Sequence, residues 1–310
     1  MRRVLHVLNT APGPASIPPG LAVLFRLLLV LAFPVFGLLG LGGCSGGRVI
    51  PLDGPQPTYP YHALEAHSKY WLLADSLWEL RADPESARRS LKAYRTAAKR
   101  QKKVPELRAR LSHACYFVAA YLETSADKKD GLFREGQNAA EAGMLLHPGY
   151  AAKFRETGDE TEAVRELDSA YVEVLYWYVI NLGRELSQES VIIRRGNKDR
   201  VEALNDRLLQ LDPGFCYAGP HRIAGAIPAR LPEGNLEDAK AHFEKAVALA
   251  PGYLGNRVAY ADFYAIRTGD RALFLEQLTL VTAAKADSIQ EIAPENRYAQ
   301  EQAKLLLAKS

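Results

Sequence analysis

Three Pro-Gly-aromatic turns constrain the fold of this chain more than any other feature. Each follows a stretch with the apolar spacing of a helix: Pro148-Gly149-Tyr150, Pro213-Gly214-Phe215 and Pro251-Gly252-Tyr253. The spacings between the three prolines are close to two units and one unit of a roughly 34-residue helical repeat. Because one helix pair cannot bury its apolar face alone, such repeats stack on one another.

The third turn carries the clearest repeat pattern. It is preceded by Ala239-x3-Phe243-x2-Ala246, which is similar to the second half of a tetratricopeptide (TPR) repeat. In that repeat, small residues lie where two helices touch, an aromatic ring fills the groove, and proline stops the helix. The segments before the other two turns keep only part of the pattern. We therefore predict an all-α fold in which antiparallel helix pairs stack as a degenerate TPR-like solenoid.

Start and stop signals delimit the expected helices. Asp83-Pro84 and Pro105 place proline in the first turn of a helix. Thr157-Gly158-Asp159 and Thr268-Gly269-Asp270 each combine a glycine stop with an aspartate cap. Val191-Ile192-Ile193 is short and is expected in a connecting loop. The patterns predict helices over residues 62–81, 84–102, 105–124, 131–146, 160–187, 199–211, 217–230, 235–249, 254–267, 271–285 and 295–309.

The first residues are typical of a targeting segment rather than a fold. An apolar run over residues 27–41 ends in Leu41-Gly42-Gly43-Cys44, the kind of site that a lipoprotein signal peptidase accepts. We predict a signal peptide over residues 1–43 and lipid attachment at Cys44; the alternative is an uncleaved anchor. Residues 44–60 are expected to form a flexible tether. Residues 61–310 would form the helical domain, with N-terminal helices over 61–128 and repeats over 129–310.

The charge balance argues against nucleic-acid binding. The chain has 39 basic and 36 acidic residues, and the three surplus arginines, Arg2, Arg3 and Arg26, all lie before Cys44. The remaining sequence is therefore balanced and shows no basic patch with interleaved aromatic residues. Besides Cys44 it holds Cys115 and Cys216. These two could form a disulfide in an oxidising compartment, but two buried thiols are the favoured interpretation.

Catalytic and cofactor-binding motifs are missing from the sequence. HExxH, GxSxG, GxGxxG, a Walker loop and CxxC do not occur. We therefore predict no enzyme activity, no cofactor and no metal site.

Two groups of residues are candidates for a binding groove. Tyr176-Trp177-Tyr178 is consecutive, so the three rings cannot share one helix face, and at least one is expected to face a groove, a partner or solvent; the alternative is core packing between repeats. His221-Arg222 and Asn256-Arg257 begin successive first helices of repeat pairs, which line the concave face of such arrays. Their arginines could receive a carboxylate; ordinary surface charge is the alternative. The candidate residues are Tyr176, Trp177, His221, Arg222, Asn256, Arg257 and Tyr260.

The C-terminal half resembles the TRAP-transporter T-component (TatT) lipoprotein family. The similar segments, in order, are AYVEVLYWYVINLGREL, VEALNDRLLQLDPGF, GNLEDAKAHFEKAVALAPGY and PENRYAQEQAKLLLAK. The resemblance covers roughly residues 130–310 and implies a periplasmic helical lipoprotein that associates into a homotrimer. It also implies a role beside a TRAP solute-binding protein in the uptake of small anionic or hydrophobic substrates. The sequence departs from the family pattern at Pro228, at residues 231–234 and over residues 187–197, all of which bear on the shape of the groove.

Two functional hypotheses follow. The first is a lipid-anchored accessory protein of a TRAP-type transporter that binds the solute-binding protein and a small anionic or hydrophobic ligand. The alternative is a TPR lipoprotein scaffold that binds peptide segments during envelope or outer-membrane assembly. Both place the protein on the periplasmic side of the cell envelope. The outer membrane is favoured because Ser45, rather than aspartate, follows Cys44.

Overall fold

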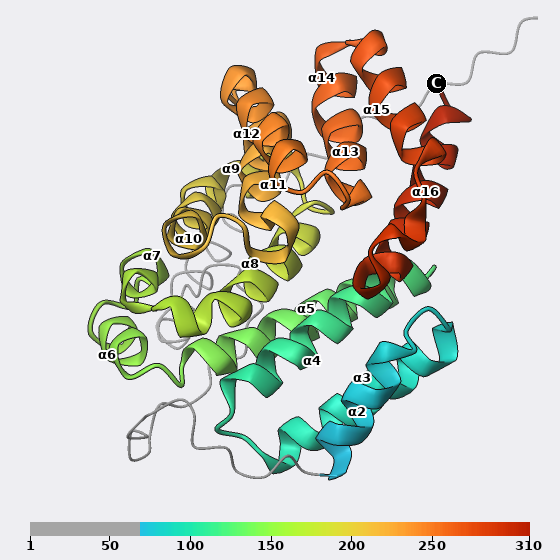
Figure 1. Cartoon of the computed structure of the whole chain (residues 1–310). Helices are drawn as coiled ribbons and strands as arrows, with labels where there is room; N and C mark the ends of the chain where they lie inside the picture. Colours follow the sequence, from blue (N-terminus) through green and yellow to red (C-terminus); the bar gives the residue numbers. More distant parts are fainter. Residues whose placement is uncertain (1–68) are drawn as a thin grey trace, which may run out of the picture. The chain divides into compact units, whose positions relative to one another are not determined.

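The computed structural model describes residues 69–310, all of which belong to one compact unit. The predicted signal peptide, the lipid attachment at Cys44 and the tether lie outside these residues. Within the part described, helices follow one another with short connections and no strand occurs. Helices adjacent in the sequence pack in pairs, as α2 with α3, α4 with α5 and α11 with α12 (Figure 1). The predicted all-α class is confirmed.

Helices α3 and α4 begin where the proline and capping signals place them, whereas the helix predicted over residues 131–146 begins five residues earlier, at Ala126. The Asp83 carboxylate accepts a hydrogen bond from the Ser86 amide at 2.8 Å, which satisfies a free donor in the first turn of α3. The next helix begins at Pro105, and its last turns widen into a π-helix, η1. The elements are α2 (Lys69–Glu79), α3 (Pro84–Arg100), α4 (Pro105–Phe117), η1 (Val118–Leu122) and α5 (Ala126–Met144).

The prediction of one helix over residues 160–187 was wrong. Leu167 is extended, and its carbonyl oxygen accepts two hydrogen bonds from Arg207, at 3.0 and 2.6 Å. The Asp168 carboxylate then caps a new start by accepting from the Ala170 amide at 2.9 Å. The segment is therefore divided into α7 (Glu160–Ala163), η2 (Val164–Glu166), η3 (Ser169–Tyr171) and α8 (Val172–Leu186).

Two short helices occupy segments for which none was predicted. Pro148 starts α6 (Pro148–Thr157), where the His147 ring nitrogen accepts from the Tyr150 amide at 3.1 Å. The expected loop at Val191-Ile192-Ile193 is instead part of α9 (Val191–Gly196). In both places a side chain just before the helix supplies the cap, so that a short apolar segment becomes helical.

The C-terminal helices agree with the predicted boundaries to within a few residues. Helix α11 begins with three residues in the left-handed region, Cys216, Tyr217 and Ala218, with φ of 47°, 59° and 60°. The predicted helix over 254–267 has a π-helical centre, η4. The elements are α10 (Lys198–Leu211), α11 (Phe215–Ala229), α12 (Leu236–Leu249), α13 (Leu254–Ala259), η4 (Tyr260–Ala265), α14 (Ile266–Thr268), α15 (Arg271–Ala283), η5 (Ala286–Ser288), η6 (Gln290–Ile292) and α16 (Ala293–Leu307).

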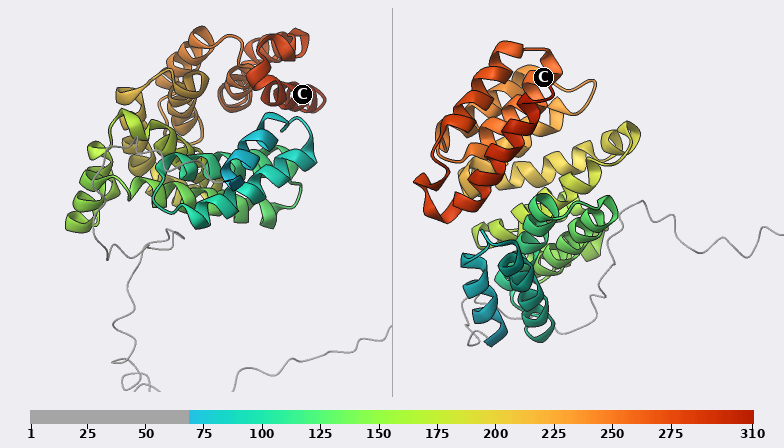
Figure 2. Two further views of the ribbon diagram at one scale, coloured as in Figure 1. Left: turned by 60° about the horizontal axis from the view of Figure 1, so that its bottom comes forward. Right: turned by 90° about the vertical axis from the view of Figure 1, so that its right-hand side faces the viewer.

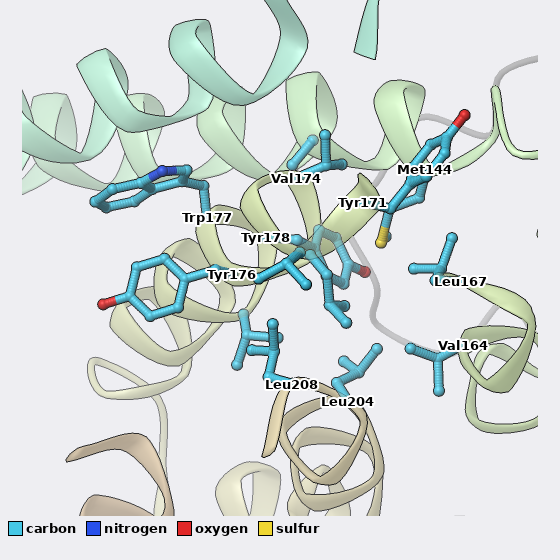
Figure 3. Close-up of a cluster of buried hydrophobic side chains, with 14 of the residues drawn as sticks. Met144, Val164, Leu167, Tyr171, Val174, Tyr176, Trp177, Tyr178, Leu204 and Leu208 are labelled. Carbon is cyan, nitrogen blue, oxygen red and sulfur yellow. The ribbon is translucent and has the colours of Figure 1, made fainter. Parts of the chain in front are cut away.

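Helix α8 lies at the centre of the largest core cluster. Its three consecutive aromatic rings leave the helix in different directions (Figure 3) and all three are buried. Trp177 stacks on His113 of α4, with ring centroids 3.6 Å apart, and the Tyr178 hydroxyl accepts from Arg200 of α10 at 2.6 Å. The expectation that one ring faces a groove or solvent assumed an open side, but α8 is covered by α4 and α5 as well as by α10 and α11.

The two ends of the described chain meet. The Arg81 side chain, which follows α2, forms a buried ion pair with Glu295 of α16, with Nε 2.8 Å from Oε1. Nearby, the rings of Tyr121 and Tyr298 stack at 4.8 Å. Helix α16 therefore contacts the N-terminal helices through side chains, and the left view of Figure 2 shows its ribbon next to theirs. This closure forms one wall of the cavity described next.

Candidate functional site

A cavity of about 530 Å³ lies among the N-terminal helices, α8, α11, η4 and α16. This volume is within the range of ordinary small-molecule sites. Aromatic and aliphatic side chains make up much of its wall, and four arginines are among the lining residues. Its lining includes Tyr116, Tyr121, Phe133, Ile180, Arg184, Arg194, Arg222, Ile223, Ala226, Ile227, Arg230, Tyr253, Val258, Asp262, Phe263, Glu295, Tyr298 and Leu305.

The four arginines of the cavity lack acidic partners. No Asp or Glu oxygen of residues 69–310 lies within 4.0 Å of the guanidinium nitrogens of Arg184, Arg194, Arg222 or Arg230. All four side chains are only partly exposed. A partly desolvated cation without a counter-ion is costly, so the wall favours an anion.

Arg222 is held rigidly by its neighbours. Its guanidinium donates to the Tyr176 hydroxyl at 2.7 Å and to Asn256 Oδ1 at 2.5 Å, and lies 4.8 Å above the Tyr253 ring. The fully buried Asn256 is itself fixed, because its Nδ2 donates to the carbonyl oxygens of Tyr217 and Ala246. Burial raises the pKa of the Tyr176 hydroxyl, so that this group stays protonated.

Arg184 and Arg230 are less satisfied. Arg184 donates to the Tyr116 hydroxyl at 3.2 Å. Arg230 stacks on the Phe263 ring at 4.2 Å, and its pKa is lowered to about 10 by burial and by the nearby Arg184 charge, against the attraction of Asp262. Burial likewise raises the pKa of the Asp262 carboxyl. An anion at this end of the cavity would stabilise the charged form of Arg230.

The two π-helical segments lie in the cavity wall. η1 contributes Tyr121, and η4 contributes Asp262 and Phe263. A π-helical turn interrupts the regular hydrogen-bond ladder and is frequently found at functional sites. Their position supports this cavity, rather than the outer surface, as the candidate site.

Of the seven candidates from the sequence, Arg222 alone is in the cavity lining. Tyr176 and Asn256 lie outside the lining and accept hydrogen bonds from the Arg222 guanidinium. Trp177 is packed in the core against His113, as described above. The sequence pattern thus singled out one wall residue and two of the groups that hold it.

The other three candidates lie elsewhere. His221 Nδ1 is 3.0 Å from His242 Nδ1, and Arg257 donates to Gln277 at 2.8 Å. Tyr260 is buried, with its ring stacked on Phe243 and its hydroxyl donating to Glu244 at 3.3 Å. Cys44 is outside the described residues.

Sequence reasoning missed Arg184, Arg194 and Arg230. One signal was available for Arg230, because it follows Arg222 by eight positions and so falls on the same helix face. Arg184 ends the aromatic helix and Arg194 lies in a segment predicted as loop. Nothing in their local sequence indicates that these two side chains meet in one cavity.

Residues 69–310 hold neither a metal site nor a membrane-spanning helix. No three His, Cys, Asp or Glu side chains there come together as a metal site, and Cys115 and Cys216 are free thiols. None of the helices in this part of the chain is both long and apolar enough to cross a membrane.

Comparison with known proteins identifies the family. The family described as TRAP transporter T-component (TAtT) matches residues 123–310, more than half of the chain. A comparison with curated proteins gave no match. The matched segment contains every element from α5 to α16, and thus all four arginines of the cavity. The chain belongs to the TRAP transporter T-component family, a family of transport components rather than of enzymes.

Proposed function

We propose that this protein is a lipid-anchored accessory component of a TRAP-type transporter, which binds the solute-binding protein and holds a small ligand in the cavity. The observation that carries the proposal is the cavity itself. Four arginines without acidic partners line it, and all four come from the segment that belongs to the T-component family. A cavity with this surplus of positive charge is suited to hold an anionic solute, which fits a transport accessory.

The proposal places the protein on the periplasmic side of the envelope, held by a lipid on Cys44, with the outer membrane favoured. A homotrimer is part of the same proposal. Replacement of Cys44 by serine should release the protein from washed membranes, because a hydroxyl does not accept the diacylglycerol. Cys115→Ser, at a buried free thiol, is the matched control and should stay in the membrane fraction.

The partner is tested by crosslinking the full-length lipoprotein in its native envelope and identifying the recovered proteins by mass spectrometry. We expect a TRAP solute-binding protein among the main products. Recovery of outer-membrane assembly factors, with no TRAP protein, would refute the proposal and favour the peptide-binding scaffold.

A further inference from the structure

We propose that the cavity binds an amphipathic organic carboxylate, whose head group is held by Arg184, Arg194 and Arg230. This inference rests on the proposed function only in taking the cavity as the ligand site, and it is independent of the protein partner.

The charge of the wall is the first argument. The acidic residues of the lining are Asp262, Glu295 and Glu301. Glu295 is bound to Arg81, and Glu301 to Lys304 at 2.7 Å, so these two do not neutralise the arginines. Asp262 remains as one acid near Arg184 and Arg230, and its oxygens lie beyond 4.0 Å from the guanidinium nitrogens of both. The head-group end of the cavity therefore carries surplus positive charge.

Arginine donors without hydrogen-bond partners lie at the same end of the cavity. The Nε atom of Arg194 is buried without a hydrogen-bond partner, and no side-chain hydrogen bond ties Arg230 in place. Arg222, by contrast, already donates to two partners. Planar guanidinium groups with free donors bind a carboxylate through paired, charge-assisted hydrogen bonds.

The apolar part of the ligand would lie along α11. Arg222 and Arg230 are eight positions apart, about 12 Å along a helix axis. Ile223, Ala226 and Ile227 lie between them and line the cavity. A ligand with its carboxylate at Arg230 would lay its apolar part along these side chains, toward the Tyr253 ring that covers Arg222.

The partial burial of these arginines also allows a prediction of the melting temperature of ligand-free variants. Arg230→Met removes a partly desolvated charge but keeps an unbranched side chain against Phe263. We expect the empty variant to melt at the temperature of the wild type or above it, while it loses carboxylate binding. A residue that served only to hold the fold together would show the opposite, a lower melting temperature.

The test uses the full-length lipoprotein in lipid nanodiscs, with empty nanodiscs as the blank, and isothermal titration with phenylbutyrate and decanoate. We expect at least one of these carboxylates to bind, with acetate and phenylbutylamine giving no heat and the matching neutral alcohol binding at least about tenfold more weakly, a difference of about 1.4 kcal/mol. Arg230→Met and Arg184→Met should each weaken binding at least about tenfold.

Arg194 and Arg195 provide a matched pair on one short helix. Arg194 lines the cavity, whereas Arg195 is exposed and paired with Glu233. Arg194→Met should therefore weaken carboxylate binding, and Arg195→Met should leave the affinity for the carboxylate within about twofold of the wild type. Equal affinity for the alcohol, an unchanged affinity in Arg230→Met, or no binding of either carboxylate to the wild type would overturn the inference.

Recovery of the solute-binding protein separates the two proposals. If carboxylates bind but no TRAP protein is recovered, the proposed function fails and the ligand assignment stands. If the TRAP protein is recovered and carboxylates do not bind, the ligand assignment alone fails.

Discussion

At the residue scale, the contacts around Arg222 depend on exact side-chain shapes. Gly219 packs against Tyr176, the ring whose hydroxyl binds Arg222. A Cβ at this position would lie 2.3 Å from Tyr176 Cε2. The ring is fully buried and has no room to move. The glycine is therefore required by a close approach between α11 and α8.

Gly219→Ala should lower the free energy of unfolding by about 1–3 kcal/mol, because overpacking forces ring and backbone apart. Gly183→Ala is the control. Gly183 lies on α8, the helix that carries Tyr176, and a Cβ there meets nothing within 4 Å. That change should leave stability unchanged or raise it by about 0.5–1 kcal/mol. Urea unfolding measures both, and equal midpoints would contradict the assigned contact.

Asn256→Ala should cost roughly 1–3 kcal/mol of stability, since it removes one of the two acceptors of Arg222 and the amide donor that reaches the carbonyl oxygens of Tyr217 and Ala246. Gln290→Ala removes one exposed amide contact, to the Asp287 carbonyl, and should change the free energy of unfolding by less than about 0.5 kcal/mol. A comparable loss in both variants would show that Asn256 is not a structural centre of the site.

At the element scale, the packing of α5 against its neighbours leaves one carboxyl in an unfavourable place. Glu160 of α7 and Arg200 of α10 form a close pair at 2.6 Å. Glu141 of α5 faces that pair, and burial, followed by repulsion from Glu160, raises its pKa from 4.5 to about 7. In the folded protein Glu141 thus keeps its proton over a pH range in which the unfolded chain loses it.

Stability should therefore fall as pH rises from about 4.5 to about 7 and then level off with respect to this group. Glu141→Gln should match the wild type near pH 4.5 and exceed it by about 1–2 kcal/mol at pH 8, allowing for partial solvent exposure. The midpoints of urea unfolding at the two pH values measure this difference. Glu276→Gln, at an exposed position on α15, is the control and should show no such gain. If Glu141→Gln brings no gain at pH 8, the carboxyl is ionised without penalty.

At the scale of the whole described unit, stability depends on a contact between its two ends. Arg81 and Glu295 are 214 positions apart and are 6% and 8% exposed. Arg81 also lies over the Trp78 ring at 4.9 Å. Since Glu295 lines the cavity, the N-terminal helices close a site whose other walls come from the family segment.

Breaking this pair should be costly. Arg81→Met or Glu295→Leu alone should each lower the free energy of unfolding by about 3–5 kcal/mol, because one buried charge is left unpaired, whereas the double variant should recover much of the loss. Arg297 lies on the same helix as Glu295 and forms an exposed pair with Asp287 of η5, so Arg297→Met should cost less than about 1 kcal/mol. Thermal unfolding of the two single variants and the double variant measures these losses. If the loss in the double variant equals the sum of the two single losses, Arg81 and Glu295 are not a coupled pair.

Local signals allowed much of the helical organisation to be predicted. Gly158 and Gly269 end their helices in the left-handed conformation, with φ of 68° and 69°, and Asp159 and Asp270 cap the helices that follow. The Asn235 side chain accepts from the amides of Glu237 and Asp238, two and three positions further on. Each of these features involves groups within a few positions of one another, so the sequence by itself determines it.

The cavity was decided by the tertiary structure. Arg222 meets Tyr176 and Asn256 across 46 and 34 positions, and Arg81 meets Glu295 across 214. The break at Leu167 depends on Arg207, 40 positions away. Caps and turns are satisfied inside one segment, whereas the partner of a buried charge depends on which helices pack together. The sequence therefore determined most of the helices and the family, whereas only the packing brought four arginines to one cavity without an acidic partner.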